Sequence, residues 1–243
     1  MKKMLVEKIW LNLCSPSRLL KNFFVLISNG IFFTKTYMLG PIALSYLTLS
    51  LMVKYKGQGV PIRQLAMLDI SVNVTRILDR HEIDYVLICG ALLGAVRQGA
   101  FAGRPYDFDI AYRDQDHEKL LKLYPIFQAN NLHIGYISGR QKKFFVVPKL
   151  LRFQRRYARI DAQPFIPYEN GWKKNRFDYE GPKISFVIDF PERGNEKYAE
   201  IFSYKFKIPA NSHDYLEAVY GKDWRIPDSR QFAWFPQENR DDI

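Results

Sequence analysis

The sequence predicts an α/β (α+β) domain with a mixed sheet and flanking helices, preceded by a helical N-terminal extension. Residues 61–243 alternate helical periodicity with short apolar runs that are bounded by turn residues. Residues 1–60 contain instead a long stretch with almost no charge. A hydrophobic content of 47% is ordinary for a globular protein and is sufficient for a sizeable core. We therefore expect two parts, residues 1–60 and residues 61–243.

The N-terminal extension is apolar but poorly suited to crossing a membrane. Between residues 22 and 53 the only charged side chain is Lys35. The uncharged run Tyr37–Val53 is shorter than the ~20 residues that a spanning helix needs, and Gly40-Pro41 interrupts it. Basic residues flank both ends of the stretch, so charge indicates no orientation for a single pass. We expect helices that dock on a membrane surface. A true span and a helical pair packed on the soluble domain are the alternatives.

Hydrophobic periodicity assigns the elements of the first half of the domain. Ala66, Ile70, Val74 and Ile77 recur at helical spacing, which predicts an amphipathic helix. An uninterrupted apolar run such as Tyr85–Cys89 is typical of a central strand. The expected elements are, in order, a helix ending near His81, strand Tyr85–Cys89, helix Ala91–Gln98 closed by Gly99, strand Phe108–Tyr112, and helix Gln115–Tyr124 capped by Asp114.

Strands dominate the second half. Runs rich in β-branched and aromatic residues, separated by turn residues, predict four strands: His133–Ile137, Phe144–Val147, Tyr157–Asp161 and Ile184–Ile188. Asn211 is expected to cap a last helix that runs to Tyr220 and stops at Gly221. Trp224, just after this stop, is expected to close an edge of the core.

Composition narrows the chemistry. With two cysteines and four scattered histidines, neither a disulfide framework nor a zinc site is expected. We expect Cys89 to be a buried thiol and the histidines to be surface or cap residues. The net charge of +11 suits nucleic acid, an anionic membrane or phosphorylated substrates, and charge alone does not distinguish them. Because no nucleic-acid recognition motif is present, we expect no nucleic-acid partner.

Two carboxylates stand two residues apart, at Asp107 and Asp109. In a strand such residues share a face, while Phe108 between them points to the opposite face. Ionised carboxylates ~4 Å apart repel by about 4 kcal/mol at an effective dielectric near 20. A bound divalent cation removes this cost, and oxygen ligands select a hard ion, Mg²⁺ or Mn²⁺. The alternative without a function is a solvated pair of aspartates at the start of a strand.

The segment before this pair contains a glycine turn. Gly90 follows the expected strand, so its backbone can approach a ligand closely and the next helix can present free N–H groups to a phosphate. Strand, glycine turn, short helix and Asp-hydrophobic-Asp together resemble the nucleotidyltransferase (polymerase-β-like) superfamily. The resemblance implies that the glycine turn, with Gly90, Ala91 and Gly94, binds the phosphates of a donor. Arg97 in the following helix is a separate candidate for donor phosphate, and a structural salt bridge is its alternative role. Ala91 stands where that superfamily usually has a serine or threonine.

A longer match is more specific. The stretch "GALLGAVRQGAFAGRPYDFDI" resembles the signature of the LicD/fukutin family, and "KIPANSHDYLEAVYGKDWRIP" resembles its closing motif. The two motifs bracket residues ~65–227 in the family's order. The usual threonine is replaced by Ala91, and Arg104-Pro105-Tyr106 replaces the usual Trp-Asp-Asp.

This resemblance implies a metal-dependent transfer of a phospho-alcohol from a CDP-linked donor to a glycan or glycolipid hydroxyl. The phospho-alcohol is phosphocholine or an alditol phosphate. The reaction would take place at the cytoplasmic face of a membrane, or in the Golgi lumen of a eukaryote. Two alternatives stay open: a nucleotidyltransferase that moves NMP to a small molecule, and a non-catalytic membrane-bound relative.

Such a site needs a third acid, to complete the metal shell or to act as general base. Asp161 in "YARIDAQPF" resembles the family's Asp-h-h-Pro segment, and Asp189 in "FVIDFPE" is the alternative. Between Arg140 and Arg159 lies a stretch rich in lysine and arginine. We interpret it either as a cationic wall for an anionic substrate or as the solvated face of a hairpin.

Overall fold

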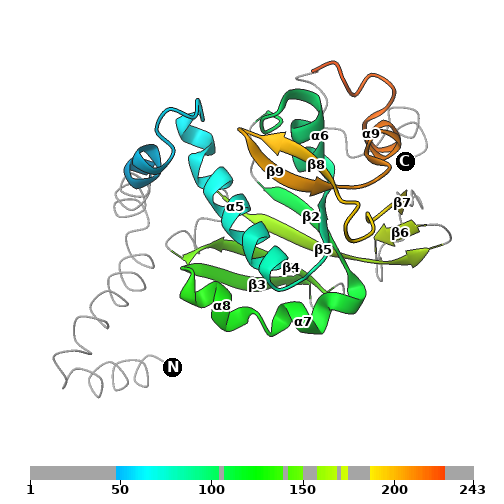
Figure 1. The fold of residues 1–243 in the computed structure, drawn as a ribbon, viewed down its shortest axis with the longest axis horizontal. Coiled ribbons are helices and arrows are strands. Elements are labelled where there is room, and N and C mark those ends of the chain that lie inside the picture. Colours follow the sequence, from blue (N-terminus) through cyan, green and yellow to red (C-terminus); the bar gives the residue numbers. More distant parts are fainter. Residues whose placement is uncertain are drawn as a thin grey trace, which may run out of the picture. The chain divides into compact units, whose positions relative to one another are not determined.

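The computed structural model describes residues 48–103, 107–138, 142–149, 158–168, 171–174 and 187–227 (Figure 1). The chain divides into two compact units, Met1–Ser50 and Leu51–Ile243. Most of the predicted N-terminal extension therefore lies outside the described residues. Within those ranges, no helix combines the length and the apolar character that a bilayer crossing requires.

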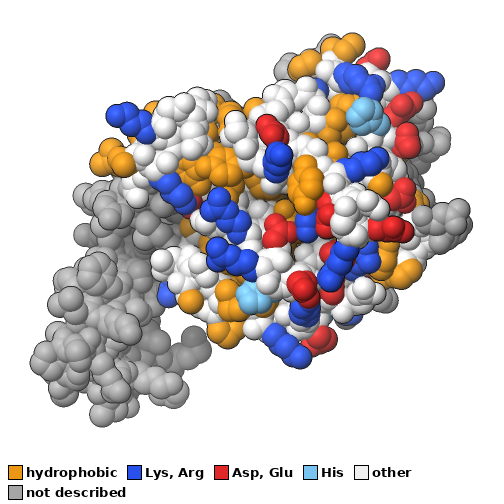
Figure 2. All heavy atoms as spheres, viewed as in Figure 1, with side chains coloured by type: hydrophobic (Ala, Val, Ile, Leu, Met, Phe, Trp, Pro, Cys, Tyr) orange, Lys and Arg blue, Asp and Glu red, His pale blue; other side chains and the backbone are white. Residues whose placement is uncertain are grey.

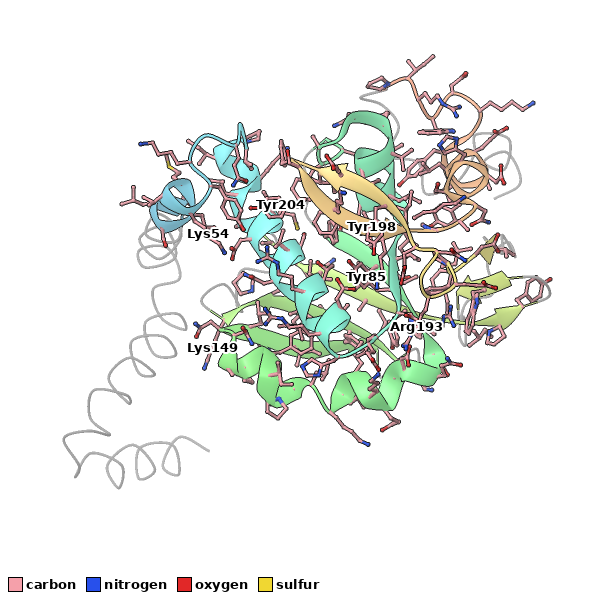
Figure 3. All side chains as sticks on the ribbon, in the orientation of Figure 1. Lys54, Tyr85, Lys149, Arg193, Tyr198 and Tyr204 are labelled. Carbon is pink, nitrogen blue, oxygen red and sulfur yellow. The ribbon has the colours of Figure 1, made fainter. Side chains whose placement is uncertain are left out.

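Residues 51–60 belong to the second unit, so the division lies upstream of the expected boundary at residue 60. Leu51 and Tyr55 are buried in that unit. The Tyr55 hydroxyl donates a hydrogen bond to Asp69 Oδ1 (3.0 Å), and its ring lies 6.0 Å from that of Tyr204. Lys54, which is labelled in Figure 3, also pairs with Asp69. These contacts attach the segment to helix α5 and to the strand that carries Tyr204.

The first predicted elements are confirmed. Helix α5 (Leu65–Arg80) ends where the periodicity predicted, and its buried residues follow the apolar face of the helix. Strand β1 (Tyr85–Leu87) and helix α6 (Cys89–Gln98) follow. Gly99 closes α6 in the left-handed conformation (φ 62°), which glycine adopts without steric cost.

The central sheet is mixed, and its main path runs β1-β2-β5-β4-β3. β2 pairs with β5 in parallel, whereas β1 with β2, β5 with β4, and β4 with β3 are antiparallel. β6 and β7 extend the sheet from β5. The bounds are β2 Phe108–Arg113, β3 Leu132–Ser138, β4 Lys143–Pro148, β5 Ile160–Tyr168, β6 Gly171–Lys174 and β7 Val187–Ile188.

β1 corrects one expectation, because it lies at the end of this path and not at its centre. All three of its residues are nevertheless buried. The hairpin of β8 (Lys197–Ile201) and β9 (Tyr204–Ile208) forms a separate two-stranded sheet, and β9 contacts β1. The hairpin thus covers a strand that would otherwise be exposed, which explains its continuous apolar sequence.

The expected helix Gln115–Tyr124 is broken into a 3-10 turn and two short helices: η3 Asp114–Asp116, α7 His117–Leu121 and α8 Tyr124–Ala129. Pro125 in the first turn of α8 explains the break, because proline cannot supply the N–H that a continuous helix needs. Asp114 is not the N-cap, because it is the first residue of η3, whose N-cap is Arg113, and the N-cap of α7 is Asp116. The Asp114 carboxylate pairs with Lys142 (3.1 Å). The last helix, α9 (Ser212–Tyr220), lies where it was predicted.

One face of the sheet forms the main core. Phe108 is fully buried on it, with its ring 6.0 Å from Phe101 and 5.4 Å from Phe206 of β9. Farther along β2, the ring of Tyr112 stacks on His117, which is also buried. His117 therefore corrects the expectation that every histidine lies at the surface or at a cap. The expectation for Trp224 is confirmed, since this side chain is buried.

Helix α5 lies across the near face of the sheet, where it contacts β4 (Figure 1). On the outer surface of this side, basic and acidic side chains are interspersed (Figure 2). The basic side chains of the described residues are therefore not gathered into one patch on this face. The site described below is built from β2, β5 and the start of α6.

Candidate functional site

Three carboxylates converge at the amino-terminal ends of β2 and β5. Asp109 and Asp161 are direct partners in the register of these parallel strands. Asp107 immediately precedes β2, and Arg159 joins it to Asp161 by donating from Nη2 to one carboxylate oxygen of each, both at 3.1 Å. We call Asp107, Asp109 and Asp161 the carboxylate cluster. Asp189, the alternative third acid, follows β7 on the other side of β6.

Backbone contacts fix this convergence. The Phe108 N–H donates to the Arg159 carbonyl (2.8 Å), which sets the register in which Asp109 meets Asp161. The Ile88 N–H donates to the Asp109 carbonyl (3.1 Å). Because Ile88 is the residue before α6, this bond places the glycine turn beside the carboxylates.

Two members of the carboxylate cluster are withdrawn from solvent. Asp109 is 5% exposed and Asp161 is 2% exposed. Burial, followed by the neighbouring charges of Asp107 and Asp161, raises the pKa of Asp109 to about 7. Burial also raises the pKa of Asp161. Among the described residues, Gln163 is the only uncharged side chain that hydrogen-bonds to Asp109, with its Nε2 donating to Oδ1 at 3.0 Å. Asp109 is thus held near the point of ionisation at neutral pH.

Two basic side chains lie against the cluster. Arg159 Nε lies 2.7 Å from Asp161 Oδ1, and Lys143 Nζ lies 3.3 Å from Asp161 Oδ2. Both come from the basic stretch, but Lys142 of the same stretch pairs with Asp114 instead. Several other members of the stretch lie outside the described residues: Arg140, Arg152, Arg155 and Arg156.

The donor chemistry of the cluster fits a hard divalent cation. It offers carboxylate oxygens only, and a cation would relieve the repulsion that, after burial, raises the pKa of Asp109. In the arrangement observed, however, no three acidic, histidine or cysteine side chains of the described ranges are placed to hold a metal ion. The guanidinium of Arg159 pairs with two of the three carboxylates. The residue types of the cluster therefore suit Mg²⁺ or Mn²⁺, but the Arg159 guanidinium occupies part of the space between them.

The two glycines of α6 have different surroundings. A Cβ atom built on Gly90 would meet no described atom within 4 Å. A Cβ atom on Gly94 would lie 2.4 Å from the Ala100 carbonyl oxygen and 2.6 Å from the Ala102 nitrogen. Gly94 therefore permits the chain after α6 to fold back on the helix, whereas Gly90 leaves open space at the turn. Ala91 is buried in the helix.

Arg97, also predicted to bind donor phosphate, lies in the last turn of α6 and is half-buried. Its Nε and Nη2 donate to the side chain of Gln98, at 3.1 and 3.0 Å. Helix α6 contacts α9, whose last residue is Tyr220. Burial raises the pKa of the Tyr220 hydroxyl, and the positive charge of Arg97 lowers it.

Two tyrosines of α9 complete the surroundings of the glycine turn. The Tyr215 hydroxyl accepts a hydrogen bond from the Cys89 N–H (3.4 Å) and lies 3.6 Å from Cys89 Sγ. Burial, then the neighbouring Cys89 and Asp109, raises the pKa of Tyr220. Cys89 is half-buried at the first position of α6, which corrects the expectation of a strand thiol in the core.

Sequence reasoning did not single out Tyr215, Tyr220 or Gln163 as site residues. The two tyrosines lie within the second motif quoted above, so their place in it was a usable signal. For Gln163 no such signal exists, because its contact with Asp109 follows only from the pairing of β2 with β5.

Comparisons with known proteins add little. No protein-family model matches the chain, and no curated protein matches it. Among solved structures, the chain is similar to the lincosamide antibiotic adenylyltransferase LnuA with bound lincomycin, at a TM-score of 0.37 and 13% sequence identity. The likeness covers 58% of this chain and 78% of that chain. At this level it assigns neither a fold family nor an activity here.

Proposed function

We propose that the carboxylate cluster is the centre of a metal-dependent transferase that acts on a diphosphate-linked donor. The observation that carries this proposal is the meeting of three acids at the ends of two parallel strands, beside the open turn at Gly90. Burial of acids that repel one another costs stability, and such a cost is typical of functional sites. The α/β fold with a mixed sheet is compatible with the nucleotidyltransferase-like architecture that the sequence resembles.

Following the LicD/fukutin resemblance, we take the donor to be a CDP-linked phospho-alcohol and the acceptor to be a glycan or glycolipid hydroxyl. The hydroxyl attacks the β-phosphorus, the bond from this phosphorus to the bridging oxygen breaks, and CMP leaves. A divalent ion held by the carboxylate cluster would neutralise the charge that develops on the phosphate oxygens.

The protein's own groups have distinct tasks in this proposal. Backbone N–H groups at the start of α6, at Gly90 and Ala91, face the diphosphate, and Arg97 adds positive charge near them. Asp107 and Asp109 would hold the cation. Asp161 either completes the ligand set or accepts the proton of the attacking hydroxyl, a task that its raised pKa favours.

A thermal-shift panel tests the donor class. A ligand of the folded state stabilises it by RT ln(1 + [L]/Kd), about 2.7 kcal/mol at a hundredfold excess over Kd. We expect CDP-choline or a CDP-alditol to raise the melting temperature only with Mg²⁺ or Mn²⁺, and Asp107→Asn to abolish the shift. A preference for ATP or CTP would favour nucleotidyl transfer. No shift with any nucleotide would favour the non-catalytic relative.

Membrane association is part of the proposal. At the start of the second unit, Met52 and Val53 are exposed apolar residues, and the basic Lys54 and Lys56 follow them. Exposed apolar side chains beside basic ones suit an anionic membrane surface. We expect the full chain to sediment with membranes and to be released by detergent. If it stays in the soluble fraction at physiological salt without detergent, this part of the proposal is wrong.

A further inference from the structure

The proposed reaction gives no role to Arg159, although this side chain lies within the site. Its guanidinium lies between two members of the carboxylate cluster, 3.1 Å from Asp107 Oδ2 and 2.7 Å from Asp161 Oδ1. Arg159 stands two residues before Asp161, at the entrance to β5, so both side chains reach the same face. The arginine is therefore built into the site by the strand that supplies the third acid.

The charges around it show what it does without a metal. Three carboxylates meet only two cations among the described side chains, Arg159 and Lys143. Lys143 pairs with Asp161 and its charge also acts on the pKa of Asp109, whereas Arg159 pairs with both Asp161 and Asp107. Arg159 thus supplies the positive charge between Asp107 and Asp161 that a divalent ion would supply in the loaded site.

The geometry and the exposure of the contact favour its displacement. Arg159 Nε and Asp161 Oδ1 are buried and only 2.7 Å apart, yet neither atom has a hydrogen-bond partner of normal geometry among the described residues. The side chains of Arg159 and Asp107 are 29% and 35% exposed, so solvent and ligands reach this side of the pair. The planar fork of arginine that binds a carboxylate also binds a phosphate, with two parallel N–H···O bonds.

We propose that Arg159 is the counter-cation of the metal-free cluster and a diphosphate ligand of the loaded one. When a divalent ion and the donor enter, the guanidinium leaves Asp107 and Asp161 and pairs with the diphosphate. This inference rests on the proposed function. Because metal and diphosphate each favour the displaced arginine, they bind cooperatively, and the metal alone binds weakly.

The test measures Mn²⁺ binding to the full chain, by the loss of the free-ion electron paramagnetic resonance signal, with and without CDP. We expect Arg159→Gln to bind Mn²⁺ alone about 10-fold more tightly than wild type, within the usual range of coupling between sites. We expect the same variant to lose most of the gain in Mn²⁺ affinity that CDP gives to wild type. Arg159→Lys keeps the charge without the fork, so it should bind Mn²⁺ alone as weakly as wild type and respond less to CDP.

Lys142→Gln is the matched control, because Lys142 pairs with Asp114 outside the cluster and its loss should change neither measurement. Asp109→Asn should weaken Mn²⁺ binding in either background. Circular dichroism and melting temperature show that each variant is folded. Unchanged or weaker Mn²⁺ binding in folded Arg159→Gln overturns the counter-cation role, and an undiminished CDP effect overturns the diphosphate role. If the proposed function is wrong, the result is different: in the nucleotide panel, the wild-type protein shows no preference for CDP conjugates.

Discussion

Two groups of ionic side chains in the second unit differ in how their charges balance. In the carboxylate cluster, three acids meet two cations, and two of the acids are buried. Around Asp84 the charges are closer to balance. Arg113 Nε (3.5 Å) and Arg193 Nε (3.6 Å) both face its carboxylate, and Arg193 also reaches Glu82 (4.0 Å). Arg193 lies in the segment before β8 (Figure 3).

The Asp84 group also differs from the carboxylate cluster in the side chains that surround its arginine. The Arg113 guanidinium lies 5.1 Å from the centre of the Trp172 ring and 5.2 Å from that of Phe190. Its charge therefore meets protein groups on several sides, although its Nε, like that of Arg159, has no hydrogen-bond partner of normal geometry among the described residues. The difference teaches that a surplus of buried acidic groups over cations, and not an ionic cluster as such, distinguishes a candidate site from a structural ion pair.

We expect the largest effect from a substitution in the carboxylate cluster, and it should have no counterpart in the Asp84 group. Asp109→Asn keeps the shape of the side chain and removes a charged ligand, so turnover should fall at least ~100-fold, as with loss of a main electrostatic stabiliser. Its folded state should be no less stable, because burial and the neighbouring acids already disfavour the ionised form of Asp109. Release of CMP from a CDP-linked donor, together with a thermal melt, measures both.

Asp84→Asn is the control for that experiment. It should retain turnover and lose about 1 kcal/mol of stability or less, the range of partly exposed ion pairs. If Asp109→Asn turned over as fast as wild type throughout a Mg²⁺ titration, the comparison of the two groups would have no basis. Equal losses of turnover in both variants would show that the two groups do not differ in function.

The sequence predicted the acids of the site better than their partners. Asp107 and Asp109 were found because their spacing implies a shared face, and Asp161 because of its local motif. That Asp109 lies opposite Asp161 depends on the parallel pairing of β2 with β5. Strand order is a non-local property, and the periodicity within each strand does not contain it. The position of Arg159 between two acids follows from the same pairing.

The fold shows a similar limit. Single elements with strong periodicity, such as α5 and α9, were predicted almost to their ends. The β8–β9 hairpin was missed because its turn residues, Phe202 and Ser203, take positive φ angles (49° and 69°) without the glycine or asparagine that usually signals such a turn. His117 was misjudged because only tertiary packing against Tyr112 and Phe144 shows that it is buried.

The contrast between a packed position and an open one recurs within α6, at Gly94 and Gly90. Gly94→Ala would place a methyl group 2.4 Å from the Ala100 carbonyl oxygen, and the backbone would have to move. We expect this variant to lose about 1–3 kcal/mol of stability, the usual cost of overpacking. Urea denaturation measures the loss. A melting curve identical to that of wild type would show that residues 100–102 do not pack on α6 as described.

Gly90→Ala is the smallest and sharpest change. Its Cβ would meet no described atom within 4 Å, and alanine favours a helix over glycine by about 1 kcal/mol. The folded protein should therefore be as stable as wild type or slightly more so. If the open turn receives the donor diphosphate, the added methyl group lies where the phosphate must approach the backbone. The affinity for CDP with Mn²⁺ should then fall, while the affinity for Mn²⁺ alone stays unchanged, because the carboxylate cluster is intact. Isothermal titration of both ligands decides the matter, since unaltered CDP affinity in a folded Gly90→Ala protein would place the diphosphate elsewhere.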